Sequence, residues 1–145
     1  MMTETDTVKL LKECDAGLRM GADSIGEVLD YVKSDKLQKK LMMGKSEHEK
    51  LTAEVERELA AEGAHGKEPN VMAKSMSWMK TNVKMAADFS DSTVADLIYD
   101  GCYMGMKSLH HYKNQYCGAG ERAADLCDRI LGLEAALAED MQPYL

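Results

Sequence analysis

Three ionisable residues, Asp15, His48 and Glu134, each stand in a stripe of apolar side chains at helical spacing. Carboxylates and imidazoles bind zinc, iron and similar ions, and such a site needs three or four ligands at fixed geometry. The same groups can instead satisfy one another in a buried polar cluster, in which Asp15 or Glu134 accepts a hydrogen bond from His48. The sequence leaves two alternatives, a residual metal site and a structural polar cluster, and we expect the cluster.

Two further groups of residues could bind metal. His110 and His111 are adjacent, so on a helix they point about 100° apart, and we expect one at an interface and one exposed. Methionine and cysteine are the soft ligands that select copper(I). The methionines, however, track apolar helix faces, which favours core or interface packing; those considered are Met42, Met43, Met72, Met76, Met79, Met104 and Met106.

Composition excludes several classes of protein. With 145 residues the chain is expected to form one domain, 1–145, that buries about 68% of its unfolded surface. A net charge of −7 argues against nucleic-acid binding, which needs clustered Lys and Arg. No apolar run approaches the ~20 residues of a membrane span and no signal sequence is evident, so we expect a cytoplasmic protein. The four cysteines contain no C-x-x-C pair, which favours reduced, mostly buried thiols.

The second helix is predicted to carry His48 in the middle of its buried face. We expect it to begin with Asp35 as the cap and to end near Glu62, because Gly63 suits the left-handed position after a helix. Its apolar stripe repeats at alternating spacings of three and four: Leu37, Leu41, Gly44, His48, Leu51, Val55 and Leu59.

The remaining helices are predicted at about 6–32, 70–87, 93–116 and 121–141. The first has the seam Val8, Leu11, Asp15, Leu18, Ala22, Ile25, Leu29 and Val32. Its glycines Gly17, Gly21 and Gly26, and the pair Gly101 and Gly105 later, predict close helix–helix contacts. Short turns make helices one and two, and the last two long helices, antiparallel neighbours. The long connection between these hairpins can cross the bundle and lets the 93–116 helix run parallel to the second.

This order of hairpin, long crossover and hairpin is that of a ferritin-like four-helix bundle, and the fold class is all-α. The chain resembles a small bacterial family of the ferritin-like superfamily, a domain of unknown function. The matching stretches are Ser46-Glu-His-Glu-Lys-Leu51, Trp78-Met-Lys80 through Phe89, and Leu109-His-His-Tyr112. The resemblance implies an acidic helix with a central histidine and a crossover helix that carries a tryptophan.

The iron-binding members of the ferritin-like superfamily have a Glu on each of two helices and a Glu-x-x-His on each of the other two. Here Lys45 stands three residues before His48, and the last helix has no histidine, so that ligand set is incomplete. We therefore assign no catalytic, cofactor-binding or metal-ligand residue, and expect no enzyme activity and no cofactor. The expected function is a non-catalytic structural or interaction module. The alternative is an iron or other transition-metal protein using Asp15, His48 and Glu134.

We also expect a homodimer. The predicted helix 70–87 has more large apolar residues than one stripe can bury, so it could pack on both the bundle and a partner. These residues are Met72, Met76, Trp78, Met79 and Met85, with Phe89 just beyond. A two-fold dimer is the commonest symmetric assembly. No nucleic-acid or membrane partner is expected.

Overall fold

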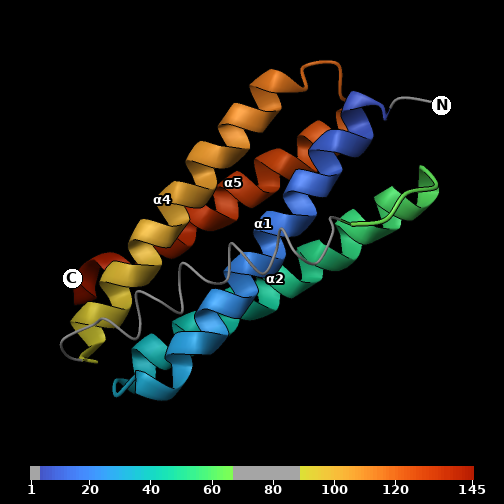
Figure 1. Cartoon of the computed structure of the whole chain (residues 1–145). Coiled ribbons are helices and arrows are strands. Elements are labelled where there is room, and N and C mark those ends of the chain that lie inside the picture. The colour runs from blue at the N-terminus through green and yellow to red at the C-terminus, as the bar shows by residue number, and fades with distance from the viewer. Residues whose placement is uncertain (1–3, 67–88) are drawn as a thin grey trace.

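A computed structural model describes residues 4–66 and 89–145, and within these ranges the chain is an all-α four-helix bundle (Figure 1). Helix α1 spans Asp6–Val28 and continues into a short 3₁₀ turn, η1, Leu29–Tyr31. Helix α2 spans Asp35–Ala61, α4 spans Asp91–Gln115 and α5 spans Glu121–Met141, followed by the 3₁₀ turn η2, Gln142–Tyr144. The predicted helix at 70–87 lies outside the described residues.

Each long helix packs against two antiparallel neighbours. α1 and α2 form one antiparallel hairpin and α4 and α5 form the other, while α1 also packs on α4 and α2 on α5. α2 and α4 run in the same direction and lie across the bundle from each other (Figure 1). α1 and α5, the other parallel pair, do make contact across the centre.

Capping residues set the ends of the helices. Thr5, Ser34 and Ser90 cap the starts of α1, α2 and α4, each side chain accepting a hydrogen bond from a backbone N–H three residues on. Ser34, rather than the predicted Asp35, is thus the cap of α2. Gly63 follows α2 with φ +69°, which confirms the predicted left-handed position.

Two other predicted boundaries were wrong by a few residues. The α-helical part of α1 ends at Val28 rather than Val32, because its last turn tightens into η1. α4 begins at Asp91 rather than Thr93, since Ser90 supplies the cap. The carboxylate of Asp91 accepts hydrogen bonds from the backbone N–H groups of Lys33 (2.8 Å) and Ser34 (3.0 Å). It therefore ties the start of α4 to the turn between α1 and α2.

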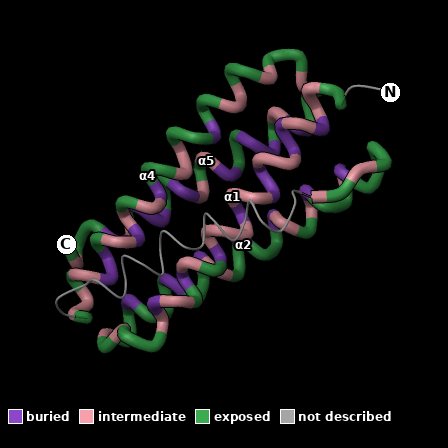
Figure 2. The backbone as a smooth tube through the Cα atoms, viewed as in Figure 1, coloured by how far each residue is buried: buried purple, intermediate pink, exposed green. Residues whose placement is uncertain are grey.

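The buried faces are those that helical periodicity indicates (Figure 2). All seven residues of the predicted α2 stripe are buried. Apolar side chains gather in two clusters, one around Leu18, Leu51 and Ile130 and the other around Ile25, Leu41 and Leu137. His48 and Glu134 lie between these clusters along α2 and α5, so a polar layer divides the apolar core.

Several side chains expected in the core or at an interface are exposed on the surface of this chain. Met42, Met43 and Met104 do not fill the core: their exposed fractions are 56%, 66% and 48%. His110 and His111 are both exposed in this chain, and the expected interface contact of one of them stays a prediction.

The cysteine expectation is confirmed, because all four thiols are free and three of them, Cys14, Cys102 and Cys127, are buried. Among the helices described, none is both long and apolar enough to cross a membrane.

Candidate functional site

The polar layer in the middle of the bundle is the candidate functional site. α2 contributes His48 and α5 contributes Glu134, whose exposed fractions are 0% and 7%. α1 contributes Gly21, and α4 contributes Cys102 and Gly105. Each belongs to the inward face of its helix, so the fold of the four helices brings them to one level.

His48 uses both ring nitrogens inside the protein. Nδ1 donates a hydrogen bond to the backbone oxygen of Gly44, one turn earlier on α2, at 2.7 Å. Nε2 contacts Oε1 of Glu134 in a short hydrogen bond. Because Nδ1 already carries a hydrogen, one further proton lies between Nε2 and the carboxylate. The prediction that Asp15 or Glu134 would accept from His48 is confirmed for Glu134.

The proton affinity of His48 follows from this geometry. Burial lowers the pKa of His48, because it disfavours the charged ring. The hydrogen bond and negative charge of Glu134, with a smaller contribution from the Gly44 carbonyl, raise the pKa by more, so the net shift is above the usual value. The pair is therefore held as an imidazolium beside a carboxylate over a wider pH range than a free histidine allows.

Cys102 is the third polar group of the layer. Burial raises the pKa of its thiol, and the negative charge of Glu134 together with the hydrogen bond between the two groups raises it further. The thiol therefore stays protonated beside the carboxylate. A protonated, buried thiol is a poor nucleophile and a poor metal ligand.

Asp15 does not join this layer. Its carboxylate, with an exposed fraction of 1%, accepts from Nε of Arg19 at 3.1 and 3.2 Å, one turn later on α1. Arg19 in turn pairs with Glu56 on α2. The sequence suggested that Asp15, His48 and Glu134 could meet, and in this respect the structure corrects it. Within residues 4–66 and 89–145, no three His, Cys, Asp or Glu side chains are grouped so that they could hold a metal ion.

The α1 glycines differ from one another in their surroundings. A Cβ added to Gly21 would stand 2.7 Å from Cδ2 and Nε2 of His48, so the ring does approach the backbone closely there. A Cβ at Gly17 would meet nothing within 4 Å, and one at Gly26 would meet only Cε of Lys45, at 3.6 Å. The predicted close packing is therefore confirmed at Gly21 and wrong at Gly17 and Gly26.

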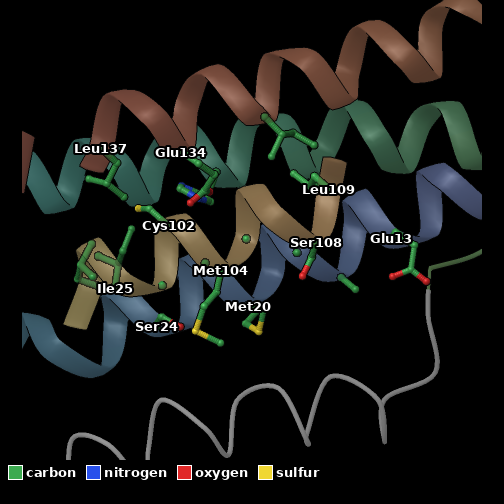
Figure 3. Close-up of a pocket in the computed structure, with 18 of the residues that line it drawn as sticks. Glu13, Met20, Ser24, Ile25, Cys102, Met104, Ser108, Leu109, Glu134 and Leu137 are labelled. Carbon is green, nitrogen blue, oxygen red and sulfur yellow. The ribbon is translucent and has the colours of Figure 1, made fainter. Parts of the chain in front are cut away.

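The layer forms the floor of a cavity of about 350 Å³ between α1, α4 and α5 (Figure 3). In this view Glu134 and Cys102 lie near each other, Met20 and Met104 lie on the opposite side, and Glu13 lies at one end. Four helix glycines line the cavity: Gly17, Gly21, Gly101 and Gly105. The spacing of these glycines in the sequence predicts helix–helix contacts, and it gives no sign of a cavity.

No family model matches the chain, and no curated protein matches it significantly. The resemblance to a ferritin-like family therefore stays a prediction. The function of the bundle has to be inferred from its own side chains.

Proposed function

We propose that this protein is a ferritin-like bundle that serves as a non-catalytic structural or interaction module. The hydrogen bonding of His48 carries this proposal: Nδ1 is engaged by Gly44 and Nε2 by Glu134. A histidine must present a ring nitrogen lone pair to bind a metal, and here each nitrogen is directed at an acceptor inside the bundle. The layer thus has the chemistry of a satisfied core polar pair.

The other helices of the layer support the same proposal. The iron-binding ferritin-like proteins need carboxylates from all four helices around their metals. At the level of His48 and Glu134, α1 supplies Gly21 and α4 supplies Gly105 and Cys102. The ferritin-like assignment itself is supported by the two antiparallel hairpins and by the common direction of α2 and α4 (Figure 1).

Elemental analysis of protein purified without chelators tests the proposal. We expect zinc, iron and copper far below one atom per chain, and no change in a His48→Gln variant. A His110→Ala variant is the matched control, because His110 is exposed and would account for metal bound adventitiously at the surface. Stoichiometric metal that is lost from His48→Gln and kept in His110→Ala would overturn the proposal in favour of a reduced-ligand metal protein.

We extend the proposal to a homodimer. Met42 and Met43 are adjacent on α2, and each is more than half exposed. Methionine is enriched in protein interfaces. The predicted contribution of residues 70–87 lies outside the described residues.

Size exclusion with light scattering decides the state of association. A dimer is expected at twice the chain mass of 16.1 kDa. A monomeric mass at tens of micromolar protein would refute the dimer. Two double variants then locate the interface: Met42→Lys with Met43→Lys, and Trp78→Ala with Met79→Ala. The variant that is monomeric contains the residues that form the interface.

A further inference from the structure

The cavity above the polar layer is kept open at a cost in helix stability. Gly17 and Gly21 are interior positions of α1, and Gly101 and Gly105 of α4, and all four line the cavity. A glycine inside a helix is less favourable for helix stability than an alanine. At Gly17 an added Cβ would meet nothing within 4 Å, so close packing does not require a glycine there. Positions that break a local rule of stability without a packing reason are candidates for function.

The shape and lining of the cavity suit a small, mainly apolar ligand. Its volume of about 350 Å³ lies at the lower end of the range of ligand pockets, and such pockets are apolar with a few placed polar groups. Ile25, Leu109 and Ile130 supply apolar walls, and Met20 and Met104 lie on the side opposite Glu134 (Figure 3). Methionine side chains adapt to irregular shapes.

The floor of the cavity offers hydrogen-bond acceptors rather than donors. The two N–H groups of His48 are used by Gly44 and Glu134, and the Cys102 thiol by Glu134. The carboxylate of Glu134 accepts these two bonds, whereas two carboxylate oxygens have about four lone-pair sites. The carboxylate of Glu134 therefore has unused acceptor sites at the floor of the cavity, and it can accept a hydrogen bond from a ligand.

Charge disfavours anionic ligands. Among the described residues that line the cavity, Glu13 and Glu134 are carboxylates, the positive charge of His48 is paired with Glu134, and none is lysine or arginine. The chain as a whole carries a net charge of −7. An anion in this cavity would meet carboxylates in a site of low dielectric, where repulsion is strong.

We propose that this cavity binds a small apolar molecule carrying one hydrogen-bond donor, a hydroxyl or an amine, which donates to the carboxylate of Glu134. The apolar body of the ligand lies against the glycine-lined surfaces of α1 and α4. This proposal is independent of the non-catalytic bundle proposal, because it concerns ligand binding and requires no reaction.

Titration of the full chain with 1-hexanol, hexylamine and hexanoate, followed by NMR, tests the proposal. The three probes share one apolar body and differ in the head group. We expect at least one of the donors, hexanol or hexylamine, to bind about tenfold or more tightly than hexanoate, because only a donor can form a hydrogen bond with the charged carboxylate of Glu134. No binding of either donor, or hexanoate binding as tightly as both, would overturn the proposal.

A Gly17→Leu variant locates the site. Its side chain would enter the open space of the cavity, and leucine favours the helix, so this variant should fold. We expect binding of the donor probes to fall tenfold or more. Gly132→Leu is the matched control, because Gly132 is an exposed interior position of α5 with nothing within 4 Å, and it should bind as wild type does. Equal binding by both variants would place the ligand elsewhere and overturn the assignment.

Discussion

The ring of His48 lies directly against the backbone of Gly21, with no room for a side chain between them. An added Cβ at Gly21 would stand 2.7 Å from both Cδ2 and Nε2 of the ring. The ring cannot move aside without breaking its hydrogen bonds to Gly44 and Glu134. The absence of a side chain on α1 therefore permits the polar pair between α2 and α5.

Gly21→Ala is expected to destabilise the protein by about 1–3 kcal/mol, the usual cost of overpacking a core, although alanine is the better helix former by about 1 kcal/mol. Denaturant unfolding measures the difference. Gly17→Ala is the matched control on the same helix, and it should be neutral or stabilising because nothing stands within 4 Å. If both variants were stabilised alike, the close contact between Gly21 and His48 would be wrong.

Stability should depend on pH through His48. Because its pKa in the fold lies above the usual value near 6.5, the contact with Glu134 contributes fully below that value. This contribution is lost as the pH rises through the raised pKa. Unfolding free energies measured between about pH 6 and pH 9 should therefore fall with pH. The slope should disappear or reverse in Glu134→Gln, because no carboxylate then offsets the lowering of the His48 pKa by burial. An unchanged slope would show that the pH dependence does not come from the contact between His48 and Glu134.

Alkylation should distinguish the four thiols. Cys117 is exposed, whereas Cys14, Cys102 and Cys127 are buried. The pKa of Cys14 is raised, first by its hydrogen bond to Cys127 and then by burial, and that of Cys102 by burial and Glu134. Native protein treated with iodoacetamide should rapidly gain one adduct by mass spectrometry. Cys117→Ser should gain none, and protein unfolded in guanidinium should gain four.

Asp91 should matter more than a surface aspartate. Its carboxylate accepts from the backbone N–H groups of Lys33 and Ser34 and so joins two hairpins. Asp91→Ala is expected to cost about 1–3 kcal/mol in denaturant unfolding, because charged hydrogen bonds to backbone are the stronger ones. Asp35→Ala, an exposed first-turn position of α2, is the control and should change stability by less than about 0.5 kcal/mol. Equal losses would show that the link between hairpins contributes nothing.

Features that depend on local spacing can be predicted from the sequence. The α2 stripe with His48 at its centre is buried as its period of three and four predicts, because a helix places those residues on one face. Gly63 ends α2 for an equally local reason, since its positive φ suits glycine. The all-α class followed from the same periodicity along the chain.

Tertiary structure alone decided which buried polar groups meet. Glu134 lies 86 residues from His48 and pairs with it, while Asp15, equally central in its own stripe, pairs with Arg19 one turn away. The axial register of one helix against another is fixed by packing over their whole length, and spacing within one helix does not specify it. The glycines are the second case: Gly17 and Gly21 look alike in sequence, yet one borders open space and the other contacts a ring. What stands opposite a glycine depends on the neighbouring helices, and only the folded bundle determines it.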